Sequence, residues 1–304
     1  MSWPELSIVV VSWHSEDDVE ALCSALPADD PRFECLVVDN GSLRPLKLPP
    51  FVRLIEPGRN LGFAGGSNLG AREARAPLLL FLNPDARVDE KNLEAFLRAF
   101  ESHPEVAGLA PRMVDADGRS LHRWALRRLP RPIDLLRMAA WTEPVLGPSA
   151  APPSGAVVEQ PAAAAWALRR GAFDTAGGFD ESFHPAWFED VDLARRLRQR
   201  NLLTRYAPQV TVRHGVGASV SELGFARFLW LHDRSLVRYA RKHHGAAFAG
   251  ILRVALVLGA TLRFGALALR TPGRAPGRAE AARAYAAKAL GAASGFRRPR
   301  RFVA

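Results

Sequence analysis

The sequence predicts an α/β fold built on a doubly wound, mostly parallel sheet. Short apolar runs with the length of buried strands alternate with segments whose apolar residues recur at helical spacing. Polar residues follow directly after several of these runs, and ligands bind at that edge of such sheets. The chain has 304 residues, of which 48% are hydrophobic, so it can form one large domain with an appendage or two modest domains.

The first three strands are expected at Leu6–Ser12, Phe33–Val38 and Val52–Ile55, which are β-branched and aliphatic runs. A helix is expected after the first strand, where Ser15 and Asp18 resemble a capping pattern. Its apolar residues are Val19, Leu22, Cys23 and Leu26. Strand, helix and strand in this rhythm are typical of a doubly wound sheet.

The second strand ends in Asp39-Asn40-Gly41-Ser42. Asn-Gly would also suit a hairpin, but the flanking residues do not alternate, so a loop at the strand end is preferred. Asp39 is then either a ligand-binding residue at the sheet edge or simply a turn former.

A glycine-rich loop, Arg59–Gly70, leads into a helix that is expected to run through Ala74. Glycines let a backbone approach a phosphate or a sugar closely, and a helix start supplies N–H donors. Neither the dinucleotide fingerprint nor a P-loop is present, so this signal is weak on its own.

A fourth buried strand at Leu78–Leu82 delivers Asn83-Pro84-Asp85 to the same edge. Pro84 stops the strand and stiffens the backbone, so we expect Asp85 to project there as an oxygen ligand for a hard cation. An amphipathic helix is expected at Asp89–Phe100 and a strand at Val106–Ala110.

From about residue 114 to residue 161 the regular pattern is lost, and a long, irregular, partly mobile insertion is expected. It contains an arginine cluster made of Arg123, Arg127, Arg128 and Arg131. These side chains could bind an anionic acceptor or a diphosphate, but a solvent-facing cluster is the simpler interpretation.

After a strand at Ala162–Leu168 and a short helix at Arg169–Thr175, the segment Gly177–Arg198 sets carboxylates among aromatic rings. Its acids include Asp180, Glu181, Glu189, Asp190 and Asp192, and its rings are Phe179, Phe183, Trp187 and Phe188. An apolar environment raises a carboxyl pKa, which suits a general base. The end of the segment reads as a helix with Glu189 and Asp190 at its start, where acids are also ordinary caps.

Two short strands, Leu203–Tyr206 and Val210–Val212, are expected next, and the second delivers His214. Helices are expected at Phe225–Tyr239 and Ala246–Leu269. In the second helix, Arg253, Arg263 and Arg270 fall on one side. A basic stripe on an apolar helix fits a helix lying in a membrane interface, and the alternative is a helix packed on the preceding domain.

The net charge is +10, which favours polyanionic partners, but only four of the 41 basic residues are lysine, so a compositional bias explains part of it. Cys23 and Cys35 match no zinc spacing and no disulfide framework, and no signal-peptide pattern is found, so a reducing cytosol is expected. Basic residues at 241–244 and 297–301 would favour anionic lipid.

Taken together, the sequence resembles bacterial family 2 glycosyltransferases of the rhamnosyltransferase-like group. Seven motifs within about residues 5–220 carry the resemblance, in the order of the family: Ile8–Trp13, Val37–Ser42, Arg59–Asn68, Leu82–Asp85, Gly177–Glu181, Glu189–Leu193 and Val212–His214. The resemblance implies a GT-A fold, a dTDP- or UDP-linked sugar donor, a divalent cation (Mg²⁺ or Mn²⁺) and inversion at the anomeric carbon.

The resemblance also implies roles for single residues. Asp190 would be the catalytic base, with Glu189 beside it, and Asp85 and His214 would hold the cation. Asn83 stands where many relatives carry another acid. The acceptor side would be shaped by Asp180, Glu181 and Trp187. The nucleotide-sugar would be bound by Ser12, Trp13, Asp39, Asn60, Gly62, Gly66, Asn68, Asn83 and Asp85.

The sequence therefore predicts a catalytic domain at residues 1–224 and a helical, basic region at residues 225–304. We expect transfer of rhamnose or a related hexose to a lipid-linked or cell-surface glycan, at an anionic membrane surface on the cytoplasmic face of the inner membrane. No nucleic acid is expected as a partner. Two alternatives remain: a non-catalytic nucleotide- or nucleic-acid-binding or membrane scaffold protein with a decayed domain, and a nucleotidyltransferase on a similar sheet.

Overall fold

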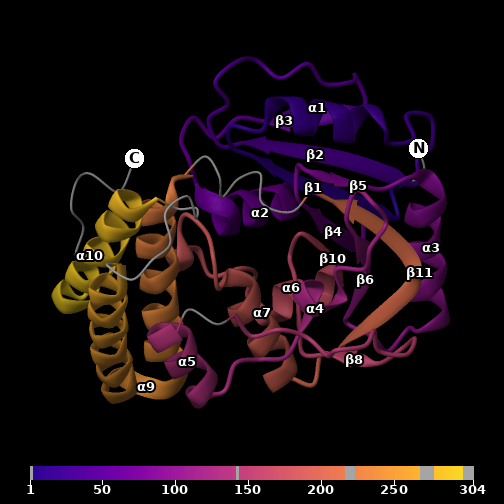
Figure 1. The fold of residues 1–304 in the computed structure, drawn as a ribbon. Helices are drawn as coiled ribbons and strands as arrows, with labels where there is room; N and C mark the ends of the chain where they lie inside the picture. The colour runs from indigo at the N-terminus through magenta and orange to yellow at the C-terminus, as the bar shows by residue number, and fades with distance from the viewer. Residues whose placement is uncertain (1–2, 142–143, 216–222, 268–276, 297–304) are drawn as a thin grey trace. The chain divides into compact units, whose positions relative to one another are not determined.

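The computed structural model describes residues 3–141, 144–215, 223–267 and 277–296 (Figure 1). It separates into two compact units, which are described one at a time. The sheet unit comprises Met1–Leu129, Leu146–Pro185 and Glu189–Val216. The helical unit comprises Pro130–Val145, Ala186–Phe188 and Gly217–Ala304.

Four parallel strands form one half of the main sheet, in the order β3-β2-β1-β4. They are β1 (Leu6–Ser12), β2 (Phe33–Asp39), β3 (Val52–Ile55) and β4 (Leu78–Leu82), as the apolar runs predict. The predicted α/β fold with a mostly parallel sheet is confirmed in this half.

The other half of the sheet continues in the order β10-β6-β11-β5, and β8 also pairs with β11. β10 runs antiparallel to its two neighbours, β4 and β6, whereas β6 and β11 are parallel to each other. These strands are β5 (Ala86–Arg87), β6 (Gly108–Val114), β8 (Val157–Val158), β10 (Ala165–Arg169) and β11 (Thr204–His214). The two strands expected within 203–212 are one strand, because a register shift between Ala207 and Thr211 absorbs the irregularity without ending the pairing.

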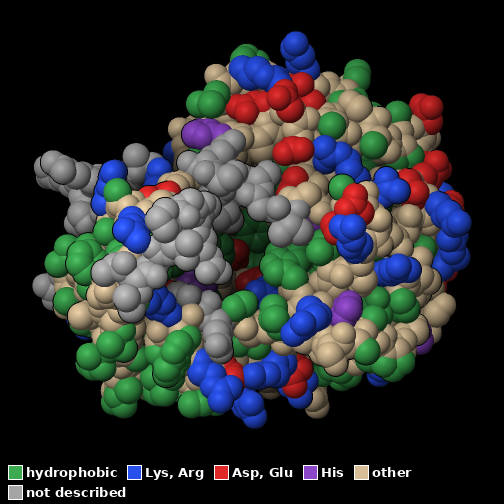
Figure 2. Space-filling view, viewed as in Figure 1, with side chains coloured by type: hydrophobic (Ala, Val, Ile, Leu, Met, Phe, Trp, Pro, Cys, Tyr) green, Lys and Arg blue, Asp and Glu red, His purple; other side chains and the backbone are tan. Residues whose placement is uncertain are grey.

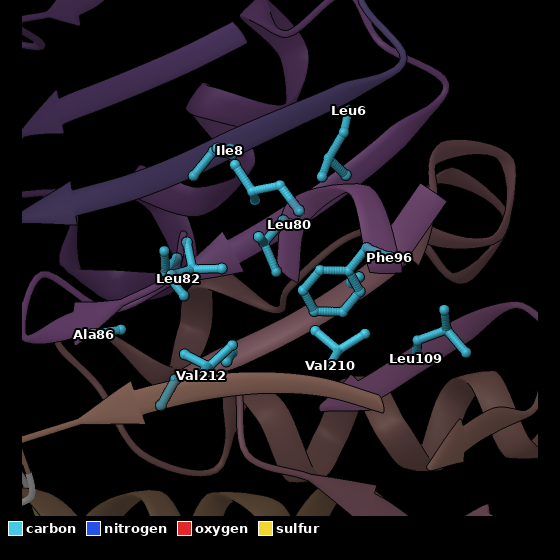
Figure 3. Close-up of a cluster of buried hydrophobic side chains, with 14 of the residues drawn as sticks. Leu6, Ile8, Leu80, Leu82, Ala86, Phe96, Leu109, Val210 and Val212 are labelled. Atoms are coloured by element: carbon cyan, nitrogen blue, oxygen red, sulfur yellow. The ribbon is translucent and has the colours of Figure 1, made fainter. Parts of the chain in front are cut away.

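Helices cover both faces of the sheet, which explains why its strands are continuous apolar runs. In β1, Ile8 and Val10 join the core under α1 and α3, whereas Val9 joins the core on the opposite face. Figure 3 shows the first core, where side chains of β1, β4, β6 and β11 meet Phe96 of α3. The helices of the sheet unit are α1 (Glu16–Ser24), α2 (Gly62–Glu73), α3 (Glu90–Ser102), α4 (His122–Ala125), α6 (Arg170–Ala176) and α7 (Glu189–Gln199).

Three local predictions are corrected. Ser15 precedes α1 without a side-chain capping bond, because its hydroxyl accepts from the Trp13 backbone N–H instead. The glycine-rich segment is mostly helix and not loop, since α2 already begins at Gly62. The insertion is built from short elements, among them α4 and a two-stranded ribbon of β7 (Leu126–Arg127) and β9 (Gln160–Pro161).

The helical unit contains α5 (Pro132–Trp141), α9 (Phe225–Ala266) and α10 (Arg278–Ser294). Two helices were predicted in the α9 segment, and α9 indeed consists of two parts joined at Gly245, whose φ of 86° is not helical. α10 was not singled out in the sequence, because its alanine-rich composition gives no clear apolar stripe.

The arginines of α9 are engaged within this unit. Arg253 donates from Nε to the Ala292 carbonyl (2.7 Å) and from Nη2 to the Ala293 carbonyl (2.7 Å), at the C-terminal end of α10. Arg263 donates to the Gly259 carbonyl of its own helix. Arg270 lies outside the described residues. The expected basic stripe thus contributes to helix packing through Arg253.

A different side of α9 is exposed and apolar. Ile251, Val254, Leu258 and Leu262 recur at helical spacing, and their exposed fractions are 58, 59, 59 and 74%. Figure 2 shows hydrophobic side chains gathered over α9 and α10. By length and composition α9 could cross a membrane, with a mean hydropathy of 1.9 in its apolar window, of which 28% is buried. Less than a third of this apolar window is therefore buried.

A buried ion pair joins α9 to α10. Lys288 Nζ lies 3.1 Å from Asp233 Oδ2, and both side chains are at most 1% exposed. The His232 ring nitrogen Nδ1 lies 3.4 Å from the other carboxylate oxygen. Burial lowers the pKa of Lys288, and the Asp233 carboxylate opposes that shift.

Replacing Lys288 with Met should destabilise the chain by about 3–5 kcal/mol, because the buried Asp233 carboxylate would lose its charged partner. Urea unfolding followed by circular dichroism measures this loss. The matched control is the double variant Asp233→Leu/Lys288→Met, which removes both charges and is expected to recover most of the lost stability. A single variant as stable as the wild type would contradict this account.

Candidate active site

The parallel register brings polar residues together at the carboxyl ends of β1 and β2, where Ser12 pairs with Asp39. The Ser12 hydroxyl lies 3.3 Å from the Ser42 hydroxyl. Asp39 Oδ1 accepts from the backbone N–H groups of Gly41 (2.9 Å) and Ser42 (2.7 Å). Asp39 therefore does form the turn after β2, while its half-buried carboxylate stays at the edge where a ligand is expected.

Trp13 follows Ser12 at this edge. Its ring stacks on His14, with ring centroids 4.3 Å apart and planes 18° from parallel. His14 has a φ of 49°, which is uncommon for a residue with a side chain. The pair presents a flat, half-buried aromatic surface beside Ser12.

The start of α2 is fixed by two asparagines. Asn60 Oδ1 accepts from the Gly62 N–H at 2.7 Å. Asn40, which sequence reasoning missed, is 2% exposed, donates to the Gly62 carbonyl (2.9 Å) and accepts from the Leu61 N–H (3.1 Å). Gly62 has a φ of 70°, and a Cβ there would lie 2.7 Å from the Pro185 carbonyl oxygen. A side chain would thus be excluded at Gly62 whether or not a nucleotide binds.

Two further residues of α2 have contacts inside the protein. Gly66 is buried, and a Cβ there would lie 2.8 Å from Val11 Cγ1, so its lack of a side chain permits close packing on β1. Asn68 Nδ2 donates to the Phe179 carbonyl (2.8 Å) and to Glu181 Oε1 (3.0 Å), and its Oδ1 accepts from the Phe179 N–H (2.9 Å). Asn68 therefore holds the segment that precedes α7. The nucleotide-binding roles expected for Gly62, Gly66 and Asn68 stay predictions.

Phe179 anchors that segment in the sheet unit. Its ring lies 5.0 Å from the ring of Phe81 on β4 and 5.6 Å from that of Phe63 on α2. Asp180 accepts from the Ser182 N–H (2.9 Å) and begins a short 3₁₀ turn, Glu181–Phe183. Trp187 belongs to the helical unit, where its ring meets Phe228 at 5.1 Å. The acceptor roles expected for Asp180, Glu181 and Trp187 stay predictions.

Asn83, Asp85 and His214 come together, although 131 residues of chain separate the first from the last. β11 pairs with β5 so that His214 lies opposite Ala86. His214 Nε2 lies 3.2 Å from Asp85 Oδ1 and 3.2 Å from the Asn83 side-chain amide nitrogen. The side chains of His214 and Asp85 are only 4 and 13% exposed.

This trio fits a divalent cation. The Asp85 carboxylate and the Asn83 side-chain amide lie beside the His214 imidazole, and carboxylate and carbonyl oxygens suit Mn²⁺ or Mg²⁺. Among the described residues, no group of three or more His, Cys, Asp or Glu side chains could hold a metal ion. The protein ligands are thus sparse, as in sites where substrate phosphates complete the coordination of the cation.

Asp190 lies in the first turn of α7 and accepts three hydrogen bonds from described residues. Arg127 Nη2 and Gln160 Nε2 each donate to Asp190 Oδ2 at 3.0 Å, and the Val191 N–H donates to Oδ1 at 2.8 Å. Its side chain is 14% exposed. Arg127 therefore belongs to the site and is not part of a solvent-facing arginine cluster.

Glu189 has a different environment from Asp190. It is 6% exposed, and its Oε2 has no hydrogen-bond partner among the described residues. Burial, together with the adjacent Asp190 charge, raises the pKa of Glu189 well above its usual value. Glu189 thus holds its proton more tightly than an exposed glutamate does, and Asp190 is the acid that accepts hydrogen bonds from polar partners.

Trp124 joins the two parts of the site. Its ring stacks on His214 with centroids 5.2 Å apart, and the Arg127 guanidinium lies 6.0 Å from the Trp124 ring centroid. A continuous set of contacts therefore runs from Asp85 through His214, Trp124 and Arg127 to Asp190. The sequence contained the arginine cluster as a signal for Arg127, but it contained none for Gln160, Trp124 or Asn40.

Comparisons with known proteins show which family this chain resembles. The family profile described as "Glycosyl transferase family 2" matches residues 7–152. The chain is 29% identical over 270 residues to the N-acetylglucosaminyl-diphospho-decaprenol L-rhamnosyltransferase of Mycobacterium tuberculosis, covering 79% of this chain and 85% of that protein. It is 27% identical over 247 residues to rhamnosyltransferase WbbL of Escherichia coli K12, covering 77 and 92%.

Two solved structures share the fold. The mannosyltransferase PcManGT of Pyrobaculum calidifontis, in complex with GDP-Man and Mn²⁺, superposes with a TM-score of 0.55 at 15% identity, covering 97% of this chain and 87% of that one. TarS 1-349 of S. aureus, in complex with UDP, gives a TM-score of 0.51 at 15% identity, covering 96 and 92%.

Replacing Glu189 with Gln should change how stability depends on pH. Below about pH 4.3 the unfolded carboxyl is protonated too, so folding causes no proton uptake there. Above it, only the folded state retains this proton, so the wild type loses stability as pH rises towards the raised pKa. Glu189→Gln cannot ionise, and its stability relative to the wild type should therefore increase from pH 5 to pH 8.

Urea unfolding at both pH values measures this difference. The control is Glu101→Gln, which makes the same replacement at an exposed residue of α3. The raised pKa of Glu189 is contradicted if the difference in the free energy of unfolding between Glu189→Gln and the wild type is the same at both pH values.

Proposed function

We propose that this chain, whose residues 7–152 match glycosyl transferase family 2, transfers a sugar from a nucleoside-diphosphate donor to a hydroxyl of a lipid-linked or cell-surface glycan, with inversion. One observation carries the proposal: Asp85 and His214 meet, with 3.2 Å between Oδ1 and Nε2, at the sheet edge that also bears Ser12 and Asp39. The two rhamnosyltransferase relatives support rhamnose or a related hexose as the sugar. A dTDP- or UDP-linked donor carries over from the family resemblance.

The nucleotide end of the donor would bind at the ends of β1 and β2. Ser12 and Asp39 supply hydroxyl and carboxylate oxygens there, and Trp13 supplies a flat ring for a base. Asn60 shapes the start of α2 by accepting from the Gly62 N–H. The diphosphate would lie towards Asp85.

Asp85 and His214 would hold a divalent cation, Mg²⁺ or Mn²⁺, with the amide of Asn83 turned to present its oxygen. When bound, such a cation stabilises the negative charge that develops on the departing diphosphate. The Asp85 carboxylate and the Asn83 amide oxygen support this assignment, because such oxygen ligands suit Mg²⁺ and Mn²⁺.

Asp190 would act as the general base. The acceptor hydroxyl oxygen forms a bond to the anomeric carbon from the side opposite the diphosphate, while the bond to the diphosphate oxygen breaks. The hydroxyl proton passes to an oxygen of Asp190. Glu189 is less suited to this role, because burial raises its pKa and makes its ionised form less favourable.

A donor screen tests the function. Nucleotide sugars are offered with Mn²⁺ or Mg²⁺, and turnover and calorimetric affinity are measured. We expect one donor to be consumed in a metal-dependent reaction. Asp190→Asn should reduce the rate of transfer by about 100-fold or more, with donor affinity unchanged. Asp85→Ala should instead weaken metal-dependent donor binding. Retained turnover in Asp190→Asn would exclude Asp190 as the base. Unchanged donor affinity in Asp85→Ala would show that Asp85 does not take part in donor binding.

We also propose that the helical unit binds the cytoplasmic face of the inner membrane, where a lipid-linked acceptor would be presented. The exposed row of Ile251, Val254, Leu258 and Leu262 supports this, because such an apolar row on a soluble surface is costly unless it is covered. Arg241 and Lys242 are exposed near the start of this part of α9 and would favour anionic lipid.

Vesicle sedimentation with phosphatidylglycerol-containing and purely phosphatidylcholine vesicles measures membrane binding. The wild type should bind both, and the anionic vesicles more strongly. Leu258→Glu with Leu262→Glu should reduce partitioning by on the order of tenfold or more, because two apolar contacts are lost. Leu43→Glu is the matched control, since Leu43 is 78% exposed in the sheet unit. Equal loss in the control, or no loss in the double variant, would reject this surface.

A further inference from the structure

Two residues of the β7–β9 ribbon converge on the proposed base. Arg127 and Gln160 lie directly opposite each other in the antiparallel register of the ribbon. Both donate to the same oxygen, Asp190 Oδ2, at 3.0 Å. The ribbon thus presents two donors, one charged and one neutral, to one carboxylate.

From this arrangement we propose that Arg127 and Gln160 are positioning residues, which fix the orientation of Asp190 so that one free lone pair faces the acceptor hydroxyl. The inference rests on the proposed function, because it takes Asp190 to be the general base. The segment between β6 and β10 supplies both residues, so it would help to orient the proposed base.

The count of hydrogen bonds supports this role. An ionised carboxylate offers about four lone-pair positions. Arg127 and Gln160 occupy positions on Oδ2, and the Val191 N–H occupies one on Oδ1. With the donors of the described residues counted, about one position remains, on Oδ1, which is what proton transfer from a single hydroxyl requires.

Both donors are themselves held in place. Gln160 is 2% exposed, and its Nε2 also donates to the Pro161 carbonyl at 2.9 Å, which defines the orientation of the amide. The Arg127 side chain is 22% exposed, and its guanidinium lies over the Trp124 ring. Neither donor can follow Asp190 if that side chain rotates, so together they restrain it.

The ribbon is also attached to the surrounding sheet unit. The Ala162 N–H donates to the Ala125 carbonyl at 2.9 Å, next to the ribbon. Glu159 accepts from the Leu129 N–H at 3.0 Å and lies 3.6 Å from Arg198 of α7. The helix that carries Asp190 and the ribbon that restrains it are therefore linked at a second point.

An anion-binding role for Arg127 fits less well. Its charge is already paired with Asp190, and its side chain is largely enclosed. Loss of a gripping residue would raise the KM for its anionic ligand, whereas loss of a positioning residue lowers kcat with little change in KM.

Steady-state kinetics of Arg127→Gln and Gln160→Met test the inference, with the donor and acceptor that the wild type uses. We expect kcat to fall by about 100-fold in Arg127→Gln, because a misplacement of about 1 Å costs this much. Donor KM, calorimetric donor affinity and melting temperature should stay unchanged. Arg127→Lys should recover part of the rate. Arg119→Gln is the matched control, since that arginine is 76% exposed and pairs with Asp117 only at the surface.

A double-variant cycle makes the test specific. If Arg127 acts through Asp190, Arg127→Gln should cause no further loss in an Asp190→Asn background. An unchanged kcat in Arg127→Gln, a raised donor KM alone, or an additive loss in the double variant would overturn the inference. If Arg127→Gln lowers the melting temperature, Gln160→Met decides by the same criteria. A wild type that transfers no sugar would instead reject the proposed function.

Discussion

The parallel register of β1 with β2 and β4 is the constraint on which the rest of the site depends. It sets Ser12 opposite Asp39 and ends β4 directly before Asn83, so polar residues that are distant in sequence share one edge. The antiparallel β5–β11 pairing then brings His214 within 3.2 Å of Asp85. A slip of one residue in either pairing would turn these side chains to the opposite face.

The site combines two kinds of residue that look alike in the sequence. Asp85 and His214 contact each other, and Asp190 contacts Arg127. Gly66 and Asn68 carry the same motif resemblance, yet they contact Val11 of β1 and Phe179 of the segment before α7. These contacts fix α2 against β1 and against the segment before α7.

The sequence predicted most of the sheet, because buried parallel strands are continuous apolar runs, and it predicted α7 because Val191, Ala194 and Leu197 recur at helical spacing. It also placed Asp85 and His214 at one edge, through strand ends and family resemblance. It could not predict that Arg127 and Gln160 lie beside Asp190. These two residues are 33 positions apart in the sequence and pair only through β7 and β9, which are strands of two residues each. Nor could it show that Glu189 and Asp190 differ, because burial depends on tertiary packing.

The central claim is that this sheet edge binds a nucleoside diphosphate and a divalent cation together. A crystal structure of the chain soaked with UDP or dTDP and Mn²⁺, with anomalous diffraction to locate manganese, tests it most directly. The account predicts one manganese peak in contact with Asp85 and His214, with the diphosphate beside it and the base near Asp39. A diphosphate bound elsewhere, or manganese away from both side chains, would contradict the account.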